Sequence, residues 1–175
     1  PENQTLTFNG TEQSPSAIAV ETSTCTVAYS TSEDGEFSDT LPSFKNAGAY
    51  TVYYRIARAN YATVSGNFAV VMKKAKATVT ANDATVTYGQ NFAPRDDAYV
   101  TSDLFGENIV VTLTCEYRAG NKVGNYAIVV SAEDNANLDI TLQNGSLSVN
   151  RATLEITLAS DNSVTYGEAF DFSTV

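Results

Sequence analysis

The stretch KNAGAYTVYY, residues 45–54, decides the fold class of this chain. Its first four residues favour a turn, because Asn and Gly tolerate positive φ angles. After the turn the side chains alternate, so that Tyr50 and Tyr54 share one face while Tyr53 lies on the other. A period of two residues predicts a β-strand with one buried face.

The same alternation recurs along the chain, and helical periodicity is almost absent. Three further runs show it: CTVAYS (25–30), IVVTLTCEY (109–117) and YAIVVSA (126–132). Asn, Asp and Gly residues separate these runs, as they do in turns. Short alternating strands joined by turns predict an antiparallel all-β protein. The sequence allows one short helical turn, in SDLFGEN (102–108).

The chain also aligns to itself, as tandem repeats do. The matched segments are 45–54 with 121–130, 70–75 with 147–152, 6–12 with 86–92, and 25–29 with 114–117. The last of these matches aligns Tyr29 with Tyr117. VTYGQNF (86–92) returns as VTYGEAF (164–170), with five of seven positions identical. The repeats predict a first β domain at residues 1–74, a second at 75–151, and the opening strands of a truncated third at 152–175.

The junctions between these units, at 70–81 and 147–159, contain no Gly or Pro. A flexible linker would be rich in Gly and Ser. We therefore expect the last strand of one unit to run almost directly into the first strand of the next. Such units would form a semi-rigid rod.

The composition excludes several classes of function. The 175 residues include no His and only two Cys, and 10 basic against 20 acidic side chains give a net charge of −10. Without His, neither a Ser-His-Asp nor a Cys-His nucleophile can be assembled, and a structural zinc site lacks ligands. The negative charge speaks against nucleic acid as a partner. No apolar run approaches the roughly 20 residues of a membrane-spanning helix. The sequence thus predicts a non-enzyme without a membrane span.

Taken in order, the motifs of this chain resemble the MBG repeats of the Tyr-Gly-X type. The residues that carry the resemblance are Ala77, Thr78, Val79, Thr87, Tyr88, Gly89, Gly106, Gly124, Asn125, Tyr126, Ile128, Asn137, Ile140 and Leu147. Residues 1–74 resemble a related repeat that carries Tyr-Asn-Gly. The resemblance implies non-catalytic modules, arranged in tandem in large bacterial surface and secreted proteins, with neighbouring repeats as partners. It supplies no list of binding residues.

Two sets of residues are candidates for a site. The pairs Tyr88-Gly89 and Tyr166-Gly167 are interpreted as a structural turn motif, in which Tyr packs at a strand end and Gly permits a turn. Tyr53 is the one tyrosine of its cluster expected to be exposed, and its ring could stack on a sugar. Tyr53 is therefore the candidate contact for a host glycan or protein.

The cysteines and the acidic turns complete the candidates. Cys25 and Cys115 fall in different units, so we expect two buried thiols and no disulfide. The acidic groups at 32–36, 95–97, 103–107 and 131–137 could bind Ca²⁺, but none follows the EF-hand pattern. Solvated turns are the preferred interpretation, and no cofactor is expected.

These observations predict tandem immunoglobulin-like β-sandwiches. A β-grasp-like sheet is the alternative, disfavoured because no strongly amphipathic helix is visible. The expected function is a stalk or adhesin module outside the cell. The alternative is a module that binds glycan or a host protein.

Overall fold

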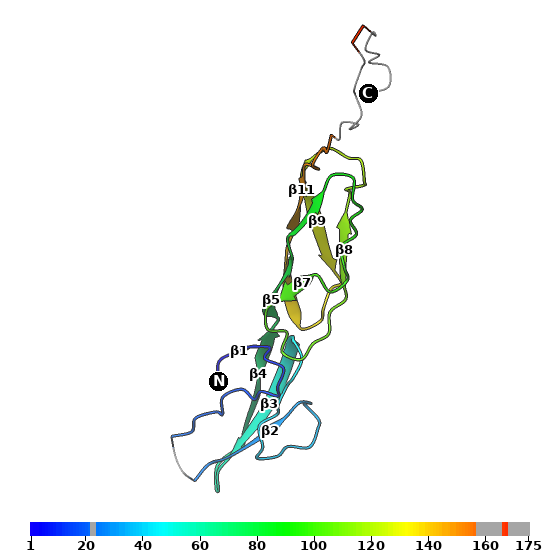
Figure 1. Cartoon of the computed structure of the whole chain (residues 1–175). Helices are drawn as coiled ribbons and strands as arrows, with labels where there is room; N and C mark the ends of the chain where they lie inside the picture. The colour runs from blue at the N-terminus through cyan, green and yellow to red at the C-terminus, as the bar shows by residue number, and fades with distance from the viewer. Residues whose placement is uncertain (22–23, 157–165, 168–175) are drawn as a thin grey trace.

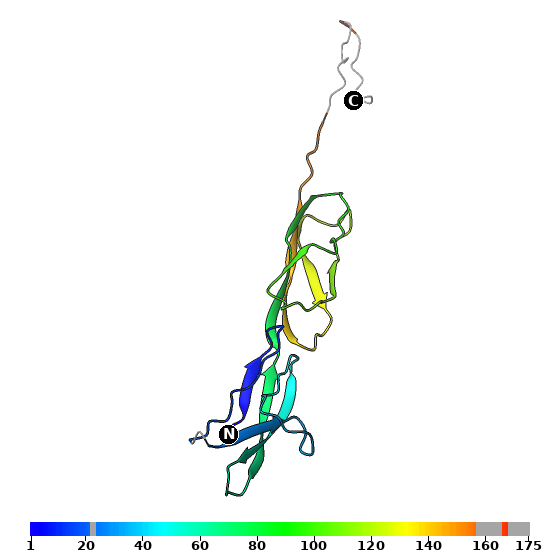
Figure 2. The same cartoon turned by 90° about the horizontal axis from the view of Figure 1, so that it is seen from below.

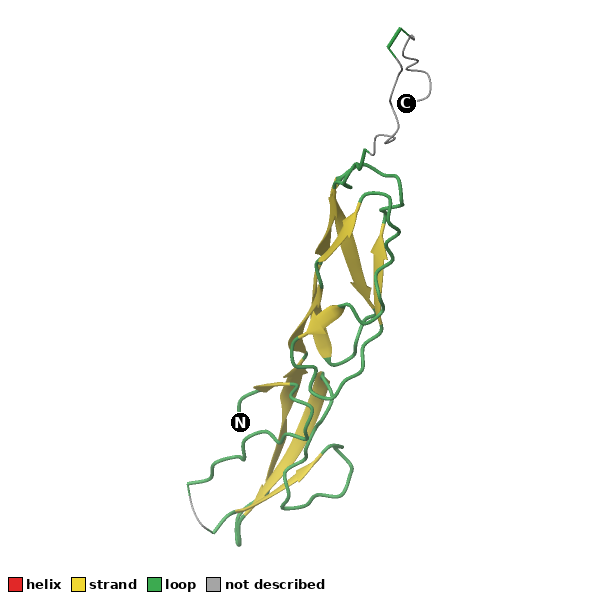
Figure 3. Ribbon diagram, viewed as in Figure 1, coloured by secondary structure: helices red, strands yellow, loops and turns green. Residues whose placement is uncertain are grey.

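The computed structural model describes residues 1–21, 24–156 and 166–167, and this part of the chain is elongated (Figures 1 and 2). The described residues contain eleven strands and no helix (Figure 3). Residues 1–21, 24–156 and 166–167 include no helix that could cross a membrane. The all-β prediction is therefore confirmed, and the β-grasp alternative lacks its helix.

Residues 1–74, here called the first module, contain one four-stranded sheet. Its strands are β1 (Gln4–Thr7), β2 (Thr26–Ser30), β3 (Gly48–Ala57) and β4 (Val64–Lys73), in the order β1-β4-β3-β2. Loops form the opposite layer, where Gln13 and Phe44 exchange two backbone hydrogen bonds of 2.9 Å. Phe8 and Phe44 from these loops pack on the inward face of β3 and β4.

Residues 75–151, the second module, form a two-layered sandwich. Its strands are β5 (Ala75–Ala81), β6 (Ala84–Thr87), β7 (Tyr99–Thr101), β8 (Val111–Cys115), β9 (Gly124–Ala132), β10 (Leu138–Gln143) and β11 (Gly145–Asn150). One sheet has the order β10-β5-β7 and the other β6-β11-β9-β8. Val79, Ile128 and Leu147 lie in the core between them.

The sheets are mixed, although the sequence predicted antiparallel domains. β1 pairs with β4 in parallel, β5 with β10, and β6 with β11. In the first module the first strand thus lies beside the last and runs in the same direction, whereas in the second module the first two strands each pair in parallel with one of the last two. Alternation of side chains cannot reveal this, because strands with one buried face have the same period in either kind of pairing.

Two smaller expectations were wrong. The SDLFGEN segment forms a β-turn, in which Glu107 N–H donates to Leu104 O at 2.9 Å and Phe105 and Gly106 have φ of 54° and 82°. Two successive positive φ angles are those of a type I′ turn. The alignment of Tyr29 over Tyr117 also fails. Tyr29 pairs with Tyr54, and the register of β8 with β9 gives that position to Leu113.

Candidate functional site at the module junction

The two modules meet along one nearly continuous strand. β4 ends at Lys73, β5 begins at Ala75, and only Lys74 lies between them. Lys73 and Lys74 are both exposed, so the buried positions change from even numbers, ending at Met72, to odd numbers, starting at Ala75. Because successive side chains of a strand point to opposite faces, this shift by one residue means that β4 and β5 bury opposite faces of the continuous strand. The prediction from the Gly- and Pro-free sequence is confirmed here.

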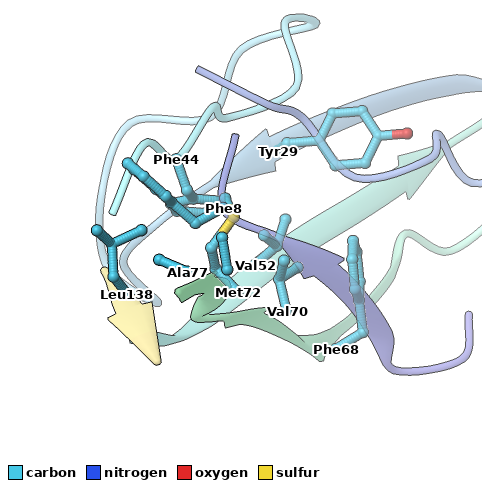
Figure 4. Close-up of a cluster of buried hydrophobic side chains, with 10 residues drawn as sticks. Phe8, Tyr29, Phe44, Val52, Phe68, Val70, Met72, Ala77 and Leu138 are labelled. Atoms are coloured by element: carbon cyan, nitrogen blue, oxygen red, sulfur yellow. The ribbon is translucent and has the colours of Figure 1, made fainter. Parts of the chain in front are cut away.

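An apolar cluster crosses this junction (Figure 4). The first module contributes Phe8, Phe44 and Met72, and the second contributes Ala77 and Leu138, each at most 8% exposed. The rings of Phe8 and Phe105 meet edge-on, with centroids 6.1 Å apart and planes at 83°. A fully buried side chain of this size contributes about 1.5–3 kcal/mol. Separating the modules would therefore expose part of a core.

A buried amide from the second module holds the first. Asn137 is 6% exposed, and its Oδ1 accepts the backbone N–H of Ala47 at 2.9 Å. Its Nδ2 donates to Glu107 Oε1 at 3.0 Å and to Asn46 Oδ1 at 3.3 Å. A buried amide needs such partners, because an unpaired one costs about 1–3 kcal/mol. Its partners at residues 46 and 47 exist only while the modules remain docked.

A second amide supports the first. Asn135 Oδ1 accepts the N–H groups of Asn137 and Leu138 at 2.8 and 3.0 Å, and its Nδ2 donates to Glu107 Oε2 at 3.1 Å. Lys74 Nζ donates to the Asn135 carbonyl at 2.7 Å. Both oxygens of Glu107 are therefore held, and the lysine between the modules is tied to the same loop.

The carboxyl of Glu107 responds to these contacts. Hydrogen bonds from Asn137 and then Asn135 hold its pKa below the ordinary glutamate value of 4.5, and the charge of Lys45 adds to the effect. Partial burial acts in the opposite direction, since it disfavours the charged form. The network thus favours an ionised Glu107 at neutral pH.

This arrangement fixes geometry and offers no obvious chemistry. It contains one carboxylate, three amides and one ammonium group, and every side chain in it is engaged in the contacts given above. Within residues 1–21, 24–156 and 166–167, no three Cys, Asp or Glu side chains gather closely enough to hold a metal ion. Two of the acidic turns considered for Ca²⁺, 103–107 and 131–137, do meet, but through Glu107 and two amides.

The two Tyr-Gly pairs lie in turns. Gly89 has a φ of 87°, and Gln90 N–H donates to Thr87 O at 3.0 Å across the Tyr88-Gly89 turn. Positive φ at the third position of such a turn favours Gly. Gly167 has a φ of 98° in a second turn with Tyr166. The remainder of VTYGEAF lies outside the described residues.

Tyr53 lies in β3, half-buried, beside an open hollow of about 300 Å³. Glu33, Asp34 and Phe37 line the same hollow, and the Arg55 guanidinium lies 3.8 Å from the centre of the Phe37 ring. The hollow lies in the first module, away from the junction. It combines aromatic rings with carboxylates beside the two central strands, β3 and β4. The sequence predicted that Tyr53 alone of its cluster would be exposed, but the exposed tyrosine is Tyr61, at 66%.

The two cysteines are half-buried and are not joined to each other. Cys25 directly precedes β2, and Cys115 is the last residue of β8. These two strands belong to different sheets, and the expectation that both thiols are buried was wrong.

Sequence reasoning missed the residues of the junction. Asn137 was noted as part of a motif, but amides between strands usually indicate turns. Glu107 was counted among the acidic turns, and Phe105 was not singled out. One signal was present: Asn137 directly precedes an apolar strand, where a buried polar residue would need partners from elsewhere.

Comparison with known families identifies part of the chain. The family model described as "MBG domain (YGX type)" matches residues 77–148. No curated protein matches the chain.

Several solved structures match the chain at low identity. The fibronectin(III)-like modules of Clostridium thermocellum CbhA share 16% identity, with 90% of this chain and 94% of that one covered and a TM-score of 0.33. Drosophila N-cadherin EC1-3 shares 11% identity over 86% of this chain and 65% of its own, with a TM-score of 0.30. Bacteroides ovatus SGBP-B, solved with a mixed-linkage heptasaccharide, shares 16% identity over 82% and 42%, with a TM-score of 0.28. At these TM-scores the likenesses carry no argument about this chain.

Proposed function

We propose that the chain is a non-catalytic spacer in a bacterial cell-surface or secreted protein, because residues 77–148 match the family model for MBG domains of the YGX type. It acts outside the cell as a semi-rigid stalk or adhesin module. Its principal partners are neighbouring modules of the same chain. Nucleic acid is not among its partners, and this segment does not enter the membrane.

One observation carries this proposal: the buried Asn137 binds both modules at once. A spacer that hinged freely would exchange the Asn137–Ala47 hydrogen bond for bonds to water, at a net cost of about 0.5–1.5 kcal/mol. The shared apolar cluster adds to that cost, because Phe8 and Leu138 would meet water on opening. Both terms favour a fixed angle between the modules.

Small-angle X-ray scattering of the chain tests the proposal. We expect the maximum dimension and the scattering profile of a rod with one fixed angle. A variant with Gly-Ser-Gly-Ser inserted between Lys74 and Ala75 is the matched control, because it keeps both modules and separates them by a flexible segment. If the unmodified chain scatters as flexibly as the insertion variant, the spacer proposal is wrong.

The hollow beside Tyr53 supports a second candidate function, the binding of a glycan or a host protein. A half-buried aromatic ring with carboxylates beside it suits a sugar, which offers apolar C–H faces and hydroxyl donors. A glycan array with the chain and with Tyr53→Ala tests it. Tyr61→Ala is the control, since Tyr61 is an exposed tyrosine of the same module outside the hollow. Binding that survives Tyr53→Ala, or no binding at all, removes this candidate.

A further inference from the structure

Each module ends in the same local geometry. Phe8 N–H donates to Lys73 O at 2.9 Å in the first module, and Tyr88 N–H donates to Asn150 O at 2.8 Å in the second. The adjacent loops also correspond: Tyr50 O–H donates to Asn46 O at 2.8 Å, and Tyr126 O–H to Lys122 O at 2.7 Å. The parallel pairs have one register too, with Leu6 opposite Met72 and Val86 opposite Val149.

These correspondences define an end surface for each module. In the first module it consists of Phe8, Asn46, Ala47, Lys74 and Ala75. In the second it consists of Tyr88, Lys122, Val123, Arg151 and Ala152.

The second module covers the end surface of the first. Phe8 and Ala75 are buried there. The Ala47 N–H is bound by Asn137, and Lys74 is bound by the Asn135 carbonyl.

The end surface of the second module is open. Tyr88 is 46% and Val123 41% exposed, and with Lys122, Arg151 and Ala152 they line a largely apolar hollow of about 490 Å³. Phe8 and Ala75, which are buried at the end surface of the first module, thus correspond to Tyr88 and Ala152, which are exposed in the second.

The strand pattern after this surface points the same way. Ala77 and Val79, which follow Lys74 in the alternation, are 2% and 0% exposed. Leu154 and Ile156 follow Arg151 at the same spacing and are 82% and 78% exposed. Large apolar side chains in strand alternation are normally covered, because each contributes about 1.5–3 kcal/mol when buried.

We infer that the end surface of the second module is a docking site for a third module of the same kind, whose first strand begins at Ala152. This inference rests on the proposed spacer function and names the partner of its free end. The occupant presents an aromatic ring to Tyr88, as Phe105 does to Phe8. It also presents an amide oxygen to the Val123 N–H, as Asn137 does to Ala47.

Charge favours such an occupant. Lys122 and Arg151 put two positive charges at this end of a chain whose net charge is −10. The face that the second module turns toward the first carries Glu107 and two amides. A third module with that face brings its carboxylate to the two basic residues.

Cysteine accessibility in a lengthened chain tests the inference. A second copy of residues 75–151 is inserted after Arg151, ahead of the native residues 152–175, with Cys25 and both copies of Cys115 replaced by serine. Val123→Cys is then placed in the inner or the outer copy, and the rate of alkylation by iodoacetamide is measured. We expect the inner thiol to react at least about tenfold more slowly than the outer one, because docking covers only the inner site.

Two controls separate the possible failures. Ala47→Cys reports the existing junction, and far-UV circular dichroism checks that every variant folds. Equal rates at the inner and outer Val123→Cys sites, with Ala47→Cys protected, would overturn this inference and leave the spacer proposal standing. A reactive Ala47→Cys would overturn the spacer proposal itself. Sedimentation of the native chain tests whether a second chain occupies the site instead. A dimer that Tyr88→Asp abolishes and Tyr61→Asp leaves intact would show this and would contradict the inference.

Discussion

Replacing Asn137 with alanine removes the amide that joins the modules. The side chain is buried and makes three hydrogen bonds, one of them to an ionised carboxylate. Two of its partners, the Ala47 N–H and Asn46, belong to the other module. Asn137→Ala therefore weakens the junction while it leaves the apolar cluster in place.

The expected loss can be worked out bond by bond. The bond to Glu107 Oε1, at 3.0 Å, is charge-assisted and contributes about 1.5–3 kcal/mol. The bond from Ala47 N–H, at 2.9 Å, contributes about 1 kcal/mol, and the longer bond to Asn46 less. Water can reach Glu107 and Asn46 after the substitution and offsets part of the sum. We expect a loss of about 3 kcal/mol in the free energy of unfolding.

Urea denaturation followed by far-UV circular dichroism measures this loss. Asn125→Ala is the control, because Asn125 is exposed and accepts a single bond, from Ser148 Oγ at 3.1 Å. Its loss should stay below about 0.5 kcal/mol, as for other surface substitutions. If Asn137→Ala costs no more than this control, the buried amide does not stabilise the junction and the reasoning fails.

Three further predictions, made with five substitutions, test other parts of the structure by the same measurement. The folded-state pKa of Glu107 lies below its ordinary value of 4.5, so its stabilisation is present above pH 4.5 and is lost as the pH falls through the folded value. Glu107→Gln should be the less stable chain at pH 7, and the difference should shrink in acid; a constant difference would contradict this. Tyr117→Phe should leave stability unchanged or raise it by up to about 1 kcal/mol, because the buried Tyr117 hydroxyl has no hydrogen-bond partner among the described residues. Tyr29→Phe should cost about 1–2 kcal/mol, because the Tyr29 hydroxyl accepts a backbone N–H at 3.0 Å. If Tyr117→Phe and Tyr29→Phe change the stability equally, the difference in hydrogen bonding does not matter and the prediction is wrong. Gly145→Ala should cost about 1–3 kcal/mol, because a Cβ there would lie 2.7 and 2.8 Å from two backbone carbonyl oxygens. Gly89→Ala should cost only about 1 kcal/mol, because its Cβ meets nothing within 4 Å although φ is 87°. If Gly89→Ala costs more stability than Gly145→Ala, the packing argument is wrong.

The sequence predicted local features well. The strand at residues 48–57 follows from alternation alone, because each side chain reports the face on which it lies. The direct passage from β4 to β5 follows from the absence of Gly and Pro. Both inferences use residues that are neighbours in the chain.

What depends on distant partners could not be predicted. Asn137 meets Asn46, 91 positions away, and nothing in either segment names the other. The parallel pairing of β6 with β11 and the register that separates Tyr29 from Tyr117 are likewise set by long-range packing. Phe105 adopts a positive φ that bulky residues rarely take, so local preference gave no warning of it.

The parallel pairing of the first two strands of the second module with its last two has a mechanical consequence. Tension along the chain enters the second module at the start of β5 and leaves it at the end of β11. These strands belong to two ladders, β5 with β10 and β6 with β11, that run in the same direction with a constant register. Pulling the ends apart therefore slides the ladders in shear, so that their hydrogen bonds share the load at the same moment and do not open one by one. An antiparallel pair loaded at the same end would unzip, and this module avoids that geometry.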